Sequence, residues 1–456
     1  MTFYTNWRAA PTTMRAVAAL VAILVLAAAC SGSKGSAGSA IDDAAPPELE
    51  QAVVAAPTGA ANSANSANSA ITLDVTAWKG NEAEPAGLAE LFERYEAQHP
   101  DVSIELTYIS RVDSDFALPK RLEDDDPPDV MMTDMPLVSY FAGEDQLVDL
   151  GTDREWYSRL PTELRTALTI DEHAYIMPFE VIGMGNFVNV DLLARVGIAE
   201  PPTTVAELKE ACRRLADADI KPLVFTGAMS ASLFLIANGL QGTDVSPAAL
   251  GSGETKFADN AAFSQGIDQI HELIDARCFD PAEAAGLDPW STALTSFKEG
   301  RVAMIPQGAW NIAAFDAVDN LDYVFTPIPA STPGGVAVDL FGVGWSIPVG
   351  AENAEAARAF VDWFALPEQV QVVLDAEGGY TPFDDGTTGI PILAARYNEA
   401  RAAGMVINYP VALGEWPKEL EAEIWASLTA LLLNPSMSND SVLSRWDRVV
   451  EEEGGQ

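Results

Sequence analysis

Trp310 follows a stretch that places it at the end of a buried strand. Phe297 ends an apolar helical stripe, and Gly300 stops that helix, since glycine tolerates the left-handed conformation of helix C-termini. Residues 301–305 then predict a short buried strand, residues 306–308 a turn, and residues 309–311 the start of a helix. Turns at strand ends are where α/β proteins tend to bind ligands. An indole there could cover an apolar ligand face or a cation; core packing is the alternative.

The sequence contains no recognisable catalytic set. It has no Gly-x-Ser-x-Gly, no His-Glu-x-x-His and no phosphate-binding glycine loop. The histidines, His99, His173 and His271, are scattered, and the acidic run at 124–126 lacks the spacing of a calcium loop. A carboxylate pair for glycoside hydrolysis depends on spatial separation, and the sequence points to none. We therefore expect no enzyme activity, no metal and no cofactor.

The elements that position Trp310 are predicted from periodicity. Alternating residues at 71–77 and 102–108 predict strands, and apolar residues at 88, 91, 92 and 95 predict a helix between them. This βαβ unit implies a parallel sheet in an α/β fold. Further strands are expected at 130–132, 323–329 and 340–348, and amphipathic helices at about 391–403, 416–433 and 440–452. Thr204 and Glu207 form the signature of a capping box at the start of another helix.

The N-terminal region is typical of an exported protein. Arg8 and Arg15 precede an apolar run of 14 residues, 16–29, which is shorter than the roughly 20 residues of a membrane-spanning helix. This pattern predicts a signal peptide over residues 1–29. Cys30 directly follows Ala28–Ala29 and resembles the cysteine of a lipobox, so we expect lipidation there. Residues 31–70 are low in complexity and are predicted to be a disordered linker.

Charge and cysteine content limit the possible partners. The chain has 26 Lys and Arg residues against 67 Asp and Glu residues, a formal net charge of −41. Nucleic-acid binding needs a basic footprint and is therefore excluded. Cys212 and Cys278 lie on the apolar stripes of two predicted helices. An exported protein permits a disulfide between them, and two separate buried thiols are the alternative. The body from about 71 to 452 is long enough for two lobes.

Three segments in order resemble one known family. They are FKEGRVAMIPQGAWN (297–311), the run from Met177 to Leu223 with its Pro-Pro-Thr-Thr, and GWSIPVGAENAEAARAFVDWFALPEQVQVVLDAEGGYTP (344–382). The chain resembles the bacterial extracellular solute-binding proteins of family 1, the maltose-binding kind. The resemblance implies a two-lobe periplasmic-binding-protein-like fold (type II), with a hinge and a ligand cleft. It also implies that residues 71–178 and 330–378 form the first lobe, and residues 179–329 and 379–452 the second.

The resemblance further implies a set of ligand contacts. Trp310 stands where the family has a sugar-stacking tryptophan. Aromatic rings suit the apolar faces of a sugar, and carboxylates accept hydrogen bonds from its hydroxyls. The expected ligand-binding residues are Trp310, Trp78, Glu82, Asp134, Glu180, Asp339 and Tyr380. In residues 226–232, where relatives often carry an aromatic, this chain has only Met229.

The implied function is capture of a sugar or oligosaccharide outside the cytoplasm and its delivery to the permease subunits of an ABC importer. The protein is expected to be a monomer, lipid-anchored to the outer face of the cell membrane. A polyamine or another cationic ligand would suit the same scaffold and the acidic composition. A secreted glycan-active enzyme and an adhesion protein are the remaining alternatives.

Overall fold

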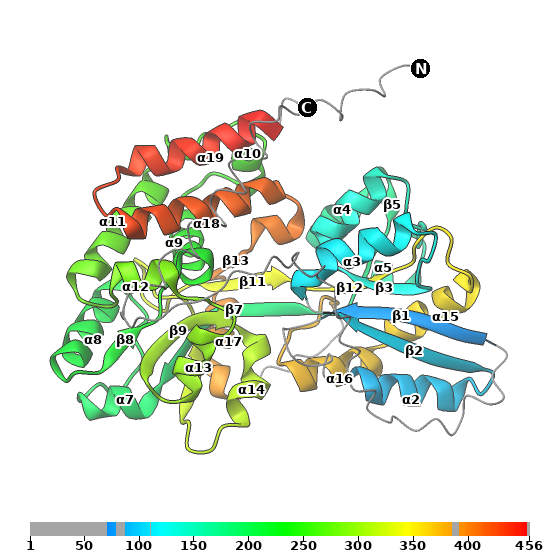
Figure 1. Ribbon diagram of the computed structural model, residues 1–456, viewed down its shortest axis with the longest axis horizontal. Coiled ribbons are helices and arrows are strands. Elements are labelled where there is room, and N and C mark those ends of the chain that lie inside the picture. The colour runs from blue at the N-terminus through cyan, green and yellow to red at the C-terminus, as the bar shows by residue number, and fades with distance from the viewer. Residues whose placement is uncertain (1–70, 79–86, 110, 385–391, 454–456) are drawn as a thin grey trace, which may run out of the picture. The chain divides into compact units, whose positions relative to one another are not determined.

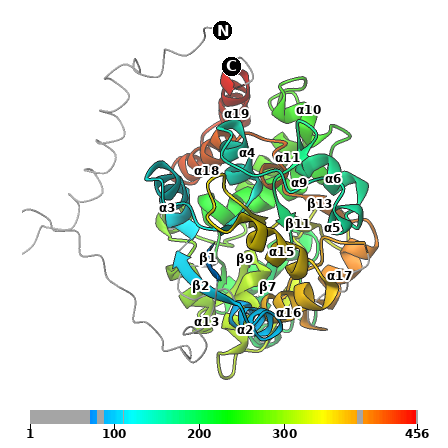
Figure 2. The same ribbon diagram turned by 90° about the vertical axis from the view of Figure 1, so that its right-hand side faces the viewer.

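The computed structural model describes residues 71–78, 87–109, 111–384 and 392–453. The described chain forms two lobes, each with its own sheet and its own helices (Figures 1 and 2). Cys30 and Glu82 lie outside the described residues, as do the predicted signal peptide and linker. Among the described residues, no helix combines the length and the apolar character needed to cross a membrane.

The first sheet has the strand order β2-β1-β3-β12-β6. β1 pairs in parallel with β2 and β3, as the βαβ pattern predicts, whereas β12 is antiparallel to β3 and β6. The strands are β1 (Ile71–Trp78), β2 (Val102–Ile109), β3 (Val130–Thr133), β6 (Met177–Pro178) and β12 (Gly344–Ser346).

Helices connect these strands and cover the sheet. In Figures 1 and 2, α2 lies on one side of β1 and β2, and α4 lies on the other. A small hairpin of β4 (Thr169–Ile170) and β5 (His173–Ala174) follows the connecting helices. The helices are α2 (Leu88–Gln98), α3 (Arg111–Glu123), α4 (Met135–Gly143), α5 (Glu155–Ser158), α6 (Thr162–Leu168), α15 (Ala354–Phe364) and α16 (Pro367–Glu377).

The second sheet has the strand order β13-β11-β7-β9-β8, and β10 also pairs with β7. Every residue of β7 is buried, because helices pack on both faces. On one face Phe187 packs edge-on against Phe315 and close to Phe325, with centroid distances of 4.8 and 4.7 Å. The strands are β7 (Val181–Asn189), β8 (Lys221–Leu223), β9 (Val302–Gly308), β10 (Tyr323–Thr326), β11 (Ala337–Phe341) and β13 (Val406–Asn408).

The helices of the second lobe include a π-helix, η1, and three 3₁₀ turns, η2 to η4, in the described chain. The three C-terminal helices agree with the predicted ranges. The bounds are α7 (Val190–Arg195), α8 (Val205–Asp217), η1 (Gly227–Ala231), α9 (Ser232–Gln241), α10 (Pro247–Gly251), α11 (Ala261–Asp275), α12 (Pro281–Gly286), α13 (Thr292–Lys298), η2 (Ala309–Asn311), α14 (Ile312–Asp316), η3 (Ile392–Ala394), α17 (Ala395–Ala402), η4 (Pro410–Leu413), α18 (Lys418–Leu433) and α19 (Asn439–Glu453).

Two predictions about strands were wrong. Residues 340–348 do not form one strand: β11 ends at Phe341 in the second sheet, and β12 begins at Gly344 in the first. The chain therefore returns to the first lobe here, not at 330. A side chain at Gly342 would fall 2.9 Å from the Glu180 carbonyl oxygen, so this close backbone crossing requires glycine. Residues 306–308, predicted as a turn, extend β9 by pairing with β7.

A disulfide joins Cys212 of α8 to Cys278, with Cα atoms 4.7 Å apart. The sequence left this bridge and two free thiols as alternatives, and the structure selects the bridge. Both residues are fully buried. The capping box of α8 is also confirmed, with Thr204 Oγ1 accepting from the Glu207 N–H at 3.1 Å.

Candidate functional site

Trp310 lies directly beyond the carboxyl end of β9, in the 3₁₀ turn η2. Its side chain is half-buried, and the six-membered part of the indole rests on Gly308. A Cβ atom at Gly308 would fall 2.1 Å from Cζ3 of Trp310, so only glycine permits this position of the ring. Within the described residues, Trp310 makes no ring contact and its indole N–H has no acceptor. Part of the indole is thus available to a ligand.

The buried side chain of Gln307 organises the segments around Trp310. Its Nε2 donates to the carbonyl of Pro289 at 3.1 Å. Its Oε1 accepts from the Gly308 N–H at 3.0 Å and from Asn311 Nδ2 at 3.5 Å. One amide therefore ties the end of β9 to the turn after it and to the loop between α12 and α13. That loop carries Trp290, a partly buried tryptophan that the sequence analysis did not single out.

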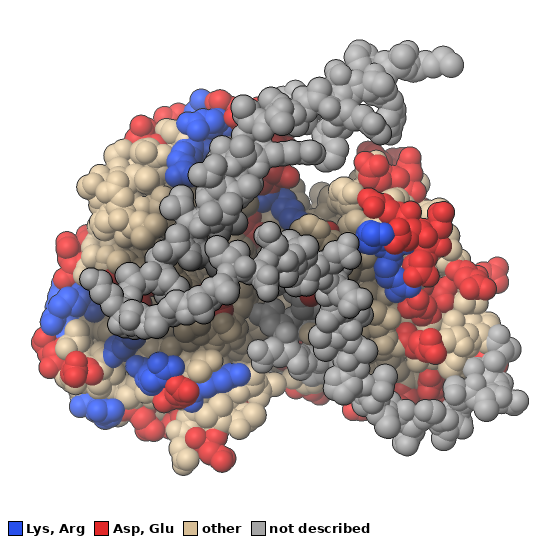
Figure 3. All heavy atoms as spheres, viewed as in Figure 1, with Lys and Arg blue, Asp and Glu red and all other residues tan. Residues whose placement is uncertain are grey.

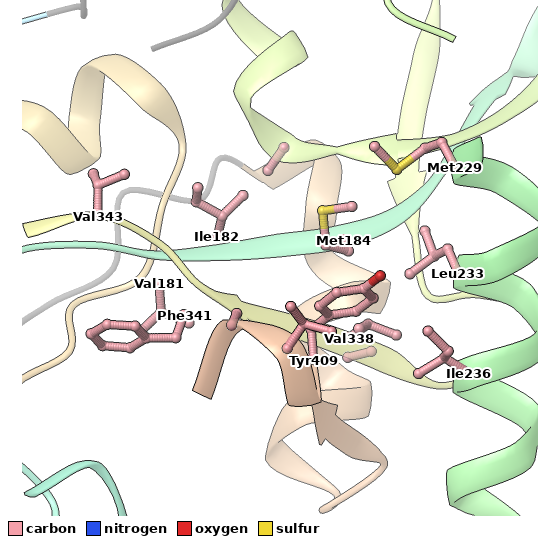
Figure 4. Close-up of a cluster of buried hydrophobic side chains, with 14 of the residues drawn as sticks. Val181, Ile182, Met184, Met229, Leu233, Ile236, Val338, Phe341, Val343 and Tyr409 are labelled. Carbon is pink, nitrogen blue, oxygen red and sulfur yellow. The ribbon is translucent and has the colours of Figure 1, made fainter. Parts of the chain in front are cut away.

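The π-helix η1 lies beside this end of β9, and Ser230 Oγ donates to the Pro306 carbonyl at 3.4 Å. π-Helical turns are rare and are often found at functional sites. Met229 of η1 is buried, and Figure 4 shows it on the same side of β7 as Ile182 and Met184. Two flexible thioethers and an aliphatic side chain therefore lie together on this side of β7.

In the first lobe, Trp78 is the last residue of β1, and Asp134 directly follows the neighbouring strand β3. Trp78 is only 5% exposed and donates its indole N–H to the Met132 carbonyl at 2.7 Å. Asp134 caps α4, accepting from the Leu137 N–H at 3.1 Å. Both residues stand at carboxyl ends of strands, as expected, and both already have structural contacts.

Glu180 lies where the chain passes from β6 of the first sheet to β7 of the second, and its side chain is 1% exposed. Its carbonyl accepts from the Gly342 N–H at 3.1 Å, and a Cβ at Gly379 would fall 2.8 Å from its side chain. The next residue, Val181, exchanges two backbone hydrogen bonds with Tyr380 at 2.7 and 2.8 Å. Three segments distant in sequence are thus bonded side by side around Glu180.

Asp339 and Tyr380 are brought together, but around Arg401 of α17 and not around Trp310. Arg401 makes three contacts of 2.5–3.0 Å with the Asp339 carboxylate, and its guanidinium lies 3.7 Å from the centroid of the Tyr380 ring. Burial raises the pKa of the Asp339 carboxyl, and the adjacent guanidinium acts in the opposite direction. The buried carboxylate is therefore already compensated, and one face of the Tyr380 ring is covered.

Acidic side chains dominate the visible face of the first lobe, whereas Lys and Arg residues lie mainly over the second lobe (Figure 3). Within the described residues, no group of three or more His, Cys, Asp and Glu side chains is arranged to hold a metal ion.

The chain belongs to the family of bacterial extracellular solute-binding proteins, whose model matches residues 79–371. Binding of a solute outside the cytoplasm is the function that this family defines, and it is a family of binding proteins, not of enzymes.

A similar curated relative is the maltooligosaccharide ABC transporter solute-binding lipoprotein of Streptococcus pneumoniae serotype 4, 37% identical over 83 residues. That match spans 18% of this chain and 19% of the relative.

Among solved structures, a chitin oligosaccharide binding protein is 19% identical with a TM-score of 0.70, covering 84% of this chain and 100% of its own. The GacH receptor of Streptomyces glaucescens, solved unliganded and with acarbose, is 22% identical with a TM-score of 0.67, covering 84% and 98%. These likenesses establish the two-lobe fold.

Proposed function

We propose that the protein captures a neutral sugar or oligosaccharide and delivers it to the permease of an ABC importer. The observation that carries this proposal is Trp310, whose indole rests on Gly308 and has neither a ring partner nor a hydrogen-bond acceptor among the described residues. An aromatic face at a strand end suits the apolar face of a sugar.

The relatives support the same ligand class. The similar pneumococcal protein is named for maltooligosaccharides and an ABC transporter, and two similar structures are named for chitin oligosaccharides or solved with acarbose. The carboxylates expected at the site differ in availability. Asp339 is paired with Arg401 in the buried interior, and Asp134 caps α4 at the end of β3. Glu82, which follows β1 in the sequence and lies outside the described residues, is the other candidate acceptor.

Export and anchoring complete the proposal. Residues 1–29 act as a signal peptide, and Cys30 becomes the lipidated N-terminus that holds the binding domain at the outer face of the membrane. The protein works as a monomer that releases its ligand unchanged.

The first test is a thermal-shift screen of maltose, maltotriose, raffinose, chitobiose, chitotriose, putrescine and spermidine, followed by calorimetry with the best ligand. Trp310→Ala should weaken binding by about 30-fold or more, on the order of 2 kcal/mol, as is typical of a central aromatic anchor. Trp310→Phe should recover part of that loss.

If only the polyamines raise the unfolding temperature of the protein, its ligand is cationic and not a sugar. Release of shorter sugars from the panel would show an enzyme. Unchanged affinity of a folded Trp310→Ala variant would return Trp310 to a packing role.

A further inference from the structure

Residues 380–384 form a short segment that both lobes hold. The segment follows α16 of the first lobe. At its start, Tyr380 exchanges two backbone hydrogen bonds with Val181, the first residue of β7 in the second sheet, at 2.7 and 2.8 Å. At its end, the Asp384 N–H donates at 2.9 Å to the carbonyl of Arg159, which follows α5 of the first lobe. The segment is therefore bonded to the second lobe at one end and to the first lobe at the other.

At the second-lobe end, an arginine covers an aromatic ring. The guanidinium of Arg401 on α17 lies 3.7 Å from the centroid of the Tyr380 ring, and the Tyr380 hydroxyl donates to Asn398 of the same helix. Asp339 of β11 fixes the guanidinium through three contacts of 2.5–3.0 Å. Tyr380 is 4% exposed, and a cation gains most from an aromatic face when the pair is removed from water. We call the pair of Arg401 and Tyr380 the second-lobe clamp.

At the first-lobe end, a second arginine covers a second ring. The guanidinium of Arg159 lies 4.4 Å from the centroid of the Phe383 ring, and Phe383 is also 4% exposed. Nη1 of Arg159 donates at 2.7 Å to the carbonyl of Ala365, at the end of α15. Arg159 thus holds the segment through its side chain as well as through its carbonyl. We call the pair of Arg159 and Phe383 the first-lobe clamp.

The chain between the two clamps is short. Tyr380 and Phe383 are three positions apart, and three residues of extended chain span at most about 11 Å. Pro382 lies between them, and its fixed φ removes part of the remaining freedom. The points at which the two lobes hold this segment therefore cannot move far apart while both clamps stay closed. A change in the angle between the lobes must pivot close to this segment or release one of the rings.

We propose that Arg159 and Arg401 are positioning residues, which hold residues 380–384 between the lobes and thereby limit how far the lobes open. Both act on the ligand only through the angle between the lobes. With both clamps closed, the unliganded protein samples a narrow range of angles, and the closed arrangement is a larger fraction of it. When one clamp is released, the range widens. The proposal concerns the motion of the lobes and not the chemistry of the ligand, so it does not rest on sugar binding.

Pulsed electron spin resonance on the full chain measures the range of distances between the lobes. Spin labels are attached at Gly143→Cys in the first lobe and Gly286→Cys in the second, two exposed positions where an added Cβ meets nothing within 4 Å. Cys30→Ala in every sample removes the third cysteine of the chain, since Cys212 and Cys278 are joined in the disulfide. This labelled protein is the parent of all variants.

Two independent variants release the first-lobe clamp. Arg159→Met removes the guanidinium and keeps an unbranched apolar side chain, and Phe383→Leu removes the ring. The matched control is Arg154→Met, which removes a nearby arginine whose partners, the Leu150 carbonyl and the Asp362 carboxylate, both lie in the first lobe. Each variant is checked for folding by circular dichroism.

Without ligand, Arg159→Met and Phe383→Leu should each broaden the distance distribution toward longer distances. The double variant should add little to either, because both changes release the same clamp. Tyr380→Leu, which releases the second-lobe clamp, should broaden the distribution in the same direction. It is compared only without ligand, because Tyr380 is itself an expected ligand contact. Arg154→Met should match the parent.

With the best ligand of the thermal-shift screen, the variants of the first-lobe clamp should return to the distances of the liganded parent. Calorimetry should show their affinity lowered by about 5-fold or more, the usual lower limit of coupling between a conformational equilibrium and a binding site. Arg154→Met should bind like the parent.

Three results would overturn the role of the first-lobe clamp: unliganded distances in its variants that equal those of the parent, an equal broadening in Arg154→Met, or a broadening that persists when ligand is bound, which would show a loosened lobe and not a freed hinge. Parent distances in Tyr380→Leu would overturn the role of Arg401. If no ligand of the panel binds, the proposed function fails, and the unliganded distances still decide whether the clamps limit opening.

Discussion

At the scale of single residues, Gly308 has a steric role and not a conformational one. Its φ of −83° and ψ of 150° are open to any residue. The constraint is the Trp310 ring, which leaves no room for a methyl group. Trp310 therefore depends on its neighbour for its position, although the ring itself is the group that would face the ligand.

Gly308→Ala should displace the Trp310 indole and lower sugar affinity by about 10-fold or more, because a central anchor contributes most of its energy through close packing. Calorimetry with the best ligand of the screen measures this effect. Gly286→Ala is the matched control, since a Cβ there meets nothing within 4 Å. Equal affinity of Gly308→Ala and wild type would show that the ring position does not matter for binding.

The buried ion pair of Asp339 and Arg401 shows why a carboxylate type alone does not identify a ligand contact. Asp339 was predicted to meet the ligand, yet it lies 4% exposed against Arg401 and Tyr397. A buried carboxylate requires a partner, and here the protein supplies it from α17.

At the scale of elements, α8 is fixed both by a cap at its N-terminus and by a disulfide on its apolar face. Its N-terminus is capped by Thr204 and Glu207, and its apolar face carries Cys212 into the disulfide with Cys278. The cap is a local interaction that sequence reveals, whereas the bridge depends on packing of α8 near the end of α11.

Glu207 gives α8 a pH-dependent contribution. Hydrogen bonds from the Thr203 backbone lower the pKa of Glu207, burial opposes this, and Thr204 adds further hydrogen bonds. A lowered folded pKa stabilises the fold above the usual glutamate value of about 4.3, and that stability is lost as the pH falls through the folded value. Glu207→Gln should therefore reduce the free energy of unfolding at pH 7 by less than about 1 kcal/mol, since the group is exposed. The reduction should shrink at pH 3. Urea titrations of wild type and Glu207→Gln at both pH values measure this reduction. An equal reduction at pH 7 and pH 3 would show that the charge of Glu207 is not its cause.

The disulfide should stabilise the second lobe. It joins residues 66 positions apart, and removing a bridge of this kind typically costs about 2–4 kcal/mol. The Cys212→Ser/Cys278→Ser variant should therefore unfold at lower temperature and lower urea concentration than wild type. Dithiothreitol should lower the unfolding midpoint of wild type, because it reduces the bridge, but not the unfolding midpoint of the double variant. Identical midpoints for the two proteins would mean that the bridge contributes nothing to stability.

At the scale of the whole molecule, the two lobes are connected where three segments bond laterally around Glu180. The glycines at 342 and 379 stand at this connection, where the backbones of the segments approach closely. Such short connections between compact lobes are where hinge motions are absorbed. Closure of the lobes around a ligand is the motion expected from this arrangement.

Anchoring concerns the molecule as a whole, because an importer must meet its binding protein at the membrane. Cys30→Ala should move the protein from the membrane fraction to the medium in the native host, since the acyl chains that provide stable anchoring would be lost. Fractionation and intact mass of the mature N-terminus measure this. A wild-type N-terminus without lipid would contradict the anchor.

The sequence by itself determined the features that arise from local patterns. Alternation predicted β1 and β2, helical spacing predicted α17 to α19, and Thr204 with Glu207 predicted the cap of α8. Trp310 was singled out because it follows a short buried strand and matches the sugar-stacking tryptophan of the family it resembles, and its contact with a ligand stays a prediction. These signals survive in a single sequence because each depends on neighbours within a few positions.

Tertiary structure decided which distant residues meet. Asp339 and Arg401 are 62 positions apart, and Gln307 and Pro289 are 18 apart on different elements. Residues 340–348 are mostly apolar, yet the chain changes sheets within them, because backbone pairing with β7 on one side of Gly342 and with β3 on the other outweighs local periodicity. Whether a carboxylate faces a ligand or a guanidinium, and whether a tryptophan completes a core or presents a free ring, depends on such long-range neighbours. Residue type and spacing do not encode them.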